Sequence, residues 1–98
     1  MAEPAAGKEV VSVNIAEAEH MIQYLKTKVL RNSDVHVDVD TPLVSSGMMD
    51  SFALVDTLME LERVTKRRIP AMKVEAEHMD TVRLMFETAI RVGKPRNA

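Results

Sequence analysis

Hydrophobic residues spaced three and four positions apart predict a helix near the start of the chain. The repeat consists of Ile15, Ala18, Ile22, Leu25 and Val29. It indicates an amphipathic helix over residues 15–31. Asn14 can cap this helix, with Glu17 three residues later in a box-like start. The turn-forming residues 32–34 are expected to end it.

A second helix, over residues 51–66, carries two apolar stripes. Leu54, Leu58 and Leu61 fall on one stripe, which we assign to the core. The other stripe lies about 120° away and has a charged border. Its members are Phe52, Val55 and Met59, bordered by Asp56, Glu62 and Arg63. An exposed apolar stripe with a charged rim is typical of a docking surface, although a tight bundle could instead bury both stripes.

The last helix is predicted from a third repeat near the end of the chain. Its apolar positions are Val82, Met85, Phe86, Ala89 and Ile90. Asp80 is expected to cap this helix, and Gly93 and Pro95 to end it. Between the second and last helices, Ile69 is expected to be buried and residues 73–77 to form a short helical turn.

The segment between the first two helices predicts a long loop over residues 32–49. Residues 35–40 alternate like a strand, but a single strand has no partner here and Pro42 follows at once. We expect Val37, Leu43 and Val44 to tuck under the bundle. The predicted fold is all-α: a small bundle of three main helices plus one short helix, with this long loop between the first two helices. Residues 15–92 form the domain, 1–14 a flexible N-terminal tail and 93–98 a C-terminal tail.

Composition narrows the class of function. The 98 residues contain no cysteine, so a disulfide, a thiolate metal site and a cysteine nucleophile are excluded. The net charge is −2 and aromatic residues are few, which disfavours nucleic-acid binding. No apolar run is long enough for a membrane span or a signal peptide, so we expect a cytoplasmic protein with no membrane insertion.

Ser51 is the main candidate for chemistry. Gly47 permits a sharp turn before it, and Asp50 or Ser51 can cap the helix that begins there. A helix start has free N–H groups and partial positive charge, so a phosphate on Ser51 would be stabilised. No base lies nearby in the predicted layout, which indicates a serine that is modified rather than catalytic. The scattered histidines, His20, His36 and His78, do not predict a metal site.

These motifs resemble the acyl carrier protein and peptidyl carrier protein family. The resemblance rests on Asp50-Ser51 followed by Val55, Leu58 and Leu61-Glu62, then Ile69-Pro70 and Asp80-Thr81-Val82. It covers residues 15 to 92, and the order and spacing of the motifs make it specific.

The resemblance implies that Ser51 carries 4′-phosphopantetheine, attached from coenzyme A by a phosphopantetheinyl transferase, with Asp50 as the adjacent motif residue. The terminal thiol would hold acyl or aminoacyl groups as thioesters for fatty-acid, polyketide, lipid or non-ribosomal peptide-type biosynthesis. A loading ligase or synthase and later enzymes would act in trans on a monomeric carrier, docking on Phe52, Val55, Met59 and Glu62. The chain itself would not be an enzyme.

Two features depart from the family pattern. Thr65 stands where many members have an aromatic residue, and the second helix ends in a basic run, 63–68, where the family is usually acidic. Cations suit a helix C-terminus, but the run can also select a different set of partners. Two alternatives remain: a carrier-like module that is never modified and acts only through protein contacts, and a helix-turn-helix regulator that uses residues 66–68 on nucleic acid.

Overall fold

The first helix begins as the sequence predicts and changes its geometry after ten residues. The computed structural model describes residues 14–32 and 34–95, and α1 spans Ile15–Tyr24. Asn14 caps it, because its Oδ1 accepts a hydrogen bond from the Glu17 amide at 3.1 Å. The predicted flexible tail, residues 1–14, lies outside the described residues except for Asn14.

A π-helical turn, η1 at Leu25–Val29, continues α1. The predicted α-helix over 15–31 is therefore wrong in its second half. The hydroxyl of Thr27 donates to the carbonyl oxygen of Gln23 at 2.7 Å and so competes for an acceptor of the regular ladder. The Leu30 amide bonds to the Leu25 carbonyl, five residues back, at 2.7 Å. The left-handed φ of 54° at Arg31 then ends the helical path.

The other two main helices confirm the predicted pattern, with one change of cap. Helix α2 spans Ser51–Thr65 and ends at Lys66, which has a left-handed φ of 57°. Helix α3 spans Val82–Val92 and ends at Gly93. The sequence suggested Asp80 as the cap of α3, and this prediction is wrong. The Thr81 hydroxyl accepts the Leu84 amide at 3.0 Å instead. The Asp80 side chain is used elsewhere.

Short elements join α2 to α3 and hold the end of α3. Two 3₁₀ turns, η2 at Ala71–Lys73 and η3 at Ala76–Met79, replace the single turn predicted over 73–77. Strand β2 (Arg67–Arg68) pairs antiparallel with β3 (Lys94–Pro95). Regular pairing therefore extends past residue 92 into what the sequence suggested was a tail.

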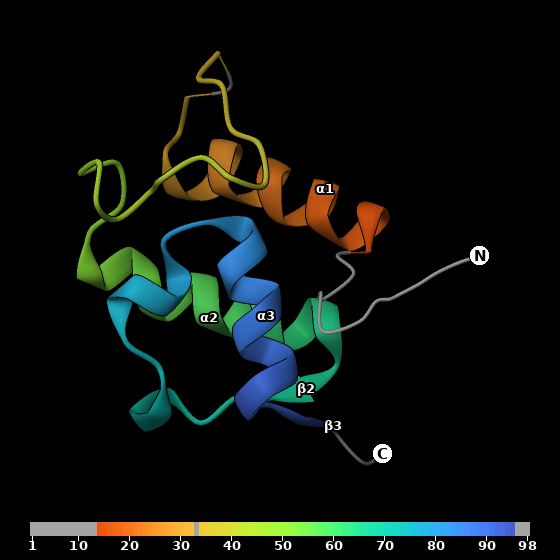
Figure 1. Ribbon diagram of the computed structural model, residues 1–98. Coiled ribbons are helices and arrows are strands. Elements are labelled where there is room, and N and C mark those ends of the chain that lie inside the picture. Colours follow the sequence, from red (N-terminus) through yellow and green to blue (C-terminus); the bar gives the residue numbers. More distant parts are fainter. Residues whose placement is uncertain (1–13, 33, 96–98) are drawn as a thin grey trace.

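The three helices pack around one core, and each contacts the other two. In Figure 1, α1 lies above α2 and α3, which cross beneath it, and part of the loop that follows α1 rises above it. Of the residues that the structure describes, thirteen hydrophobic ones are buried: Ala18, Met21, Leu25, Val37, Leu43, Met49, Leu61, Ile69, Met79, Val82, Met85, Phe86 and Ala89. The expected small all-α bundle with a long loop is confirmed.

Ile15 and Ile90, members of the apolar repeats predicted for the first and last helices, are exposed. Ile15 is the first residue of α1, and Ile90 is 48% exposed. At 100° per residue Ile90 falls about 80° from Val82, at the edge of the buried face of α3. The apolar spacing alone did not distinguish an edge position from a central one.

The loop between η1 and α2 contains turns and bends but no strand among its described residues. Val37 and Leu43 are buried and Val44 is half-buried, as predicted. The middle of the loop is fastened to the start of α3 through Arg83. The Arg83 amide donates to the Val39 carbonyl at 2.9 Å, and the Arg83 guanidinium pairs with Asp40 at 2.8 Å. The loop is thus part of the packed structure and leads directly into Ser51.

Candidate functional site

Ser51 is the first residue of α2, and its side chain is exposed. Asp50 is the cap: its Oδ1 accepts the Ala53 amide at 2.9 Å. Because Asp50 performs the capping, the Ser51 hydroxyl is not needed for it, and no hydrogen bond of that hydroxyl occurs among the described contacts. The hydroxyl is therefore available to an enzyme from solvent.

A tight turn delivers Ser51 to this position. Gly47 has a φ of 83°, which an L side chain rarely adopts. Its amide donates to the Val44 carbonyl at 3.0 Å, and the Ser46 hydroxyl donates to the Pro42 carbonyl at 2.7 Å. The Met49 side chain is buried, so the chain is anchored just before Ser51. The turn predicted at Gly47 is confirmed.

An apolar groove of about 220 Å³ begins beside Ser51 and runs between α2 and the two 3₁₀ turns. Its lining consists of Ser51, Leu54, Val55, Leu58, Ala71, Val74, Glu75, Ala76 and Met79. Leu54 and Leu58 are only half-buried, so the stripe predicted as core forms one wall of this groove, and only Leu61 is fully buried. Sequence reasoning missed the groove because its second wall comes from residues 71–79, whose irregular path leaves no periodic signal.

The second stripe of α2 is open to solvent. Phe52, Val55 and Met59 are 85%, 60% and 62% exposed. The alternative in which a tight bundle buries both stripes is therefore excluded. Large apolar side chains that are exposed together on one helix face are typical of a surface that meets a partner.

Glu62, predicted to border this stripe, is half-buried and already engaged. Its Oε2 accepts the Ile69 amide at 2.7 Å, which fastens the end of α2 to the chain that follows. The basic run lies beyond it. Strand pairing sets Arg68 directly opposite Lys94, and both line a hollow of about 280 Å³ with Lys73, Pro70 and Val92. Cations from three separate segments thus meet at one edge of the molecule.

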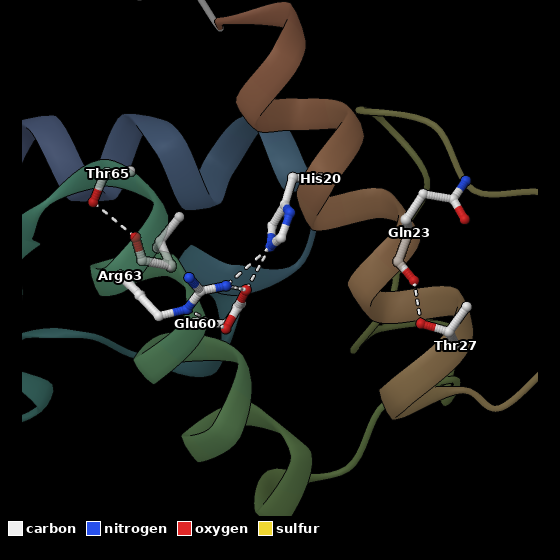
Figure 2. A network of polar contacts seen from close by, with 7 residues as sticks. His20, Gln23, Thr27, Glu60, Arg63 and Thr65 are labelled. Atoms are coloured by element: carbon white, nitrogen blue, oxygen red, sulfur yellow. Dashed lines mark hydrogen bonds and ion pairs between the residues drawn. The ribbon is translucent and has the colours of Figure 1, made fainter.

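A polar network joins α1 to α2 on another side (Figure 2). Glu60 accepts from the Arg63 guanidinium, with Nε at 3.1 Å, and contacts His20 Nε2 of α1 at 2.5 Å. The hydrogen bond from Arg63 is the main cause that lowers the pKa of the Glu60 carboxyl; partial burial opposes it and His20 adds to it. These residues border a hollow of about 340 Å³ and tie two helices together.

Asp80 makes the densest set of polar contacts near Ser51. Its Oδ1 accepts the amides of Leu43, Val44 and Ser45 at 3.1, 2.7 and 2.9 Å, and its Oδ2 accepts the Ser45 hydroxyl at 2.8 Å. Burial acts to raise the pKa of the Asp80 carboxyl, but the hydrogen bonds from Ser45, Val44 and Leu43 together lower it below its ordinary value. The ionised carboxylate is thus the form that these contacts favour.

The lowered pKa values predict a loss of stability in acid. A carboxyl whose pKa is lower in the folded than in the unfolded chain stabilises the fold above the unfolded pKa, and this is lost as the pH falls through the folded pKa. Asp80→Asn keeps the shape and removes the charge, so we expect it to cost about 1–3 kcal/mol at pH 7 and less at pH 3, which lies below the ordinary pKa of an aspartate. Melting curves of both proteins at the two pH values measure this. An equal difference in stability between the two proteins at both pH values would contradict a role for the charge.

The histidines do not converge. His20 contacts Glu60, His36 Nε2 contacts Asp38 at 3.1 Å, and His78 Nδ1 accepts the Glu75 amide at 3.1 Å. In residues 14–32 and 34–95, no group of three or more histidine and carboxylate side chains is placed to hold a metal ion. Within the same residues, no helix has the length and apolar character needed to cross a membrane.

Comparisons with known proteins give no match. No protein-family model fits the chain, and no curated protein or solved structure matches it. What the chain does must therefore be inferred from its residues and from the geometry around Ser51.

Proposed function

We propose that this protein is a carrier that bears 4′-phosphopantetheine on Ser51 and presents acyl or aminoacyl thioesters to partner enzymes. The observation that carries the proposal is the position of Ser51: an exposed hydroxyl on the first residue of a helix, capped by its neighbour Asp50, at the mouth of an apolar groove. A phosphate there is stabilised by the helix N-terminus. The motifs that resemble the carrier family support the same assignment.

The attachment step needs only an accessible hydroxyl from this chain. Ser51 Oγ attacks the β-phosphorus of coenzyme A, a new P–O bond forms, and the phosphoanhydride bond breaks to release adenosine 3′,5′-bisphosphate. The hydroxyl proton passes to a base of the transferase. The bound arm supplies the thiol that the cysteine-free sequence lacks. The role of this chain is to hold Ser51 at a fixed, solvent-facing position, and the chemistry belongs to its partners.

The groove favours an apolar acyl group over a polar aminoacyl group as cargo. It opens beside Ser51 and is lined mainly by aliphatic side chains. A flexible arm attached to Ser51 could fold back and bury the first part of an acyl chain there, at about 0.8 kcal/mol per methylene. Loading a medium-length acyl chain should therefore stabilise the fold.

Filling the groove should remove that stabilisation. Ala76 is exposed and lines the groove, so Ala76→Leu should leave the unloaded fold intact while occupying the space. We expect octanoyl loading to raise the melting temperature of the wild type by several degrees, about 4–8 °C per kcal/mol, and that of Ala76→Leu by less than half as much. Ala16→Leu, the same change at an exposed position of α1, is the matched control and should behave like the wild type.

Two surfaces are available to partners that act in trans. The stripe of Phe52, Val55 and Met59 lies beside Ser51 and suits the transferase and the enzymes that load or read the arm. At the far end of α2, Arg68 and Lys94 oppose each other across the β2–β3 pair, an arrangement of like charges that weakens strand pairing. A carboxylate-rich partner surface would relieve this repulsion, so we expect the partners to differ from enzymes that select acidic carriers.

The alternative function is a carrier-like module that is never modified and acts through the same exposed stripe alone. Intact-mass measurement separates the two. The wild type is incubated with coenzyme A, magnesium and a promiscuous phosphopantetheinyl transferase. A gain of one phosphopantetheinyl group supports the carrier, whereas no gain with several transferases on folded protein would leave the unmodified module.

A further inference from the structure

Asp80 lies some thirty residues after Ser51 in the sequence, yet it holds the segment that leads into Ser51. One carboxylate oxygen accepts three consecutive amides, those of residues 43, 44 and 45, and the other accepts the Ser45 hydroxyl. The Asp80 carbonyl adds a further bond from the Leu43 amide at 2.8 Å. Such a cluster of donors on one ionised acceptor is stronger than neutral hydrogen bonds of the same number.

The held residues control the whole turn before Ser51. The carbonyl of Val44 accepts the Gly47 amide at 3.0 Å, and the carbonyl of Leu43 accepts the Met49 amide at 3.0 Å. Fixing residues 43–45 therefore fixes both the turn at Gly47 and the residue that precedes the Asp50 cap. Asp80 also comes directly after Met79, which lines the groove beside Ser51.

We propose that Asp80 is a positioning residue for the modification of Ser51: its carboxylate keeps segment 43–50 in the one arrangement that a phosphopantetheinyl transferase accepts. Asp80 lies just before α3; among the described residues, Arg83 of α3 makes the neighbouring tie to the loop, and it reaches residues 39 and 40, before the turn. That tie does not restrain residues 43–50 directly. The inference rests on the proposed function, and it adds a residue outside the serine motif that determines how well Ser51 is recognised.

Removing the Asp80 carboxylate should weaken binding of the transferase more than it slows the transfer step on the bound protein. Without Asp80, segment 43–50 samples several arrangements, and only the fraction that matches the transferase binds. If that fraction is about one tenth, the apparent affinity falls about tenfold while the step on the bound enzyme is unchanged. A loss of global stability alone would not do this, because the folded fraction stays close to one until most of the stability is gone.

The test is steady-state kinetics of phosphopantetheinylation on the full chain, with Asp80→Ala as the main variant. We expect KM for the carrier to rise about tenfold and kcat to stay within about twofold. Asp80→Asn keeps an acceptor oxygen for the three amides and should rescue most of the effect, leaving KM two- to fourfold above the wild type. If Asp80→Ala does not fold, the smaller rise in KM of Asp80→Asn is used as the test. Hydrogen exchange of the Val44 and Ser45 amides should quicken in parallel.

Two controls separate positioning from stability. Ile69→Val, at a buried position that follows β2, should lower the melting temperature and leave KM unchanged. Asp40→Asn removes the ion pair to Arg83 and should also leave KM unchanged. Faster amide exchange in Asp80→Ala with an unchanged KM would overturn the proposal while the carrier function stands. Failure of the wild type to be modified by any transferase would instead remove the carrier function itself.

Discussion

Replacing Ser51 with alanine is expected to abolish the mass gain on incubation with coenzyme A and a transferase, while the fold stays intact. The acceptor oxygen is lost, and within residues 14–32 and 34–95 no other serine lies at the start of a helix beside the groove. The cost in stability should be below about 1 kcal/mol, because Asp50 and not Ser51 accepts the Ala53 amide and alanine is a good helix former. Intact-mass spectra and melting curves of the two proteins measure both effects.

The neighbouring serine provides a matched control. Ser46 is exposed and lies in the turn before Ser51, with its hydroxyl bonded to the Pro42 carbonyl. Ser46→Ala should still gain one phosphopantetheinyl group. Modification that persists in Ser51→Ala would contradict the assigned site, and a Ser51→Ala protein that melts far below the wild type would show that the serine has a role in folding.

Leu61→Ala is expected to have the largest effect on stability, and Met59→Ala, two residues earlier on the same helix, almost none. Leu61 is fully buried in the core, whereas Met59 is 62% exposed. Truncating a buried leucine costs about 2–5 kcal/mol, a large part of the roughly 5–15 kcal/mol that stabilises a domain of this kind. Surface changes usually stay within about 0.5 kcal/mol. Chemical denaturation of both variants gives the comparison.

The rate of phosphopantetheinylation should rank the two variants in the opposite order. Met59→Ala removes part of the exposed stripe, so we expect it to slow phosphopantetheinylation several-fold at unchanged stability. Leu61→Ala, measured at a temperature where it is still folded, should be modified close to the wild-type rate. A Met59→Ala variant that is modified normally would indicate that transferases do not use this stripe.

Local patterns in the sequence predicted most of the elements. Repeats of apolar residues at helical spacing located all three main helices. The cap at Asn14 was predicted, and Asp50 was one of two candidates for the cap of the second helix. The turn at Gly47 and the buried Ile69 were also predicted. These features depend on residues within one or two helical turns of each other, where spacing and side-chain type carry the information.

Where the predictions were wrong, a distant or competing contact was responsible. The Thr27 hydroxyl competes for the Gln23 carbonyl, an acceptor of the regular ladder, where the first helix continues as a π-helical turn. The tail after α3 pairs with the chain after α2. In each case a polar group found a partner that hydrophobic periodicity does not describe.

The sequence by itself determined that this chain forms an all-α bundle and that an exposed serine follows an aspartate at the start of its second helix. Only the tertiary structure decided that the second stripe of that helix stays open to solvent rather than buried in a tight bundle, that a groove begins beside Ser51, and that Asp80 binds the loop rather than capping the last helix. The reason is physical. Helix formation depends on neighbours three and four residues apart, whereas the groove and the Asp80 contacts with the loop require segments more than ten residues apart to meet, and only packing of the core brings them together.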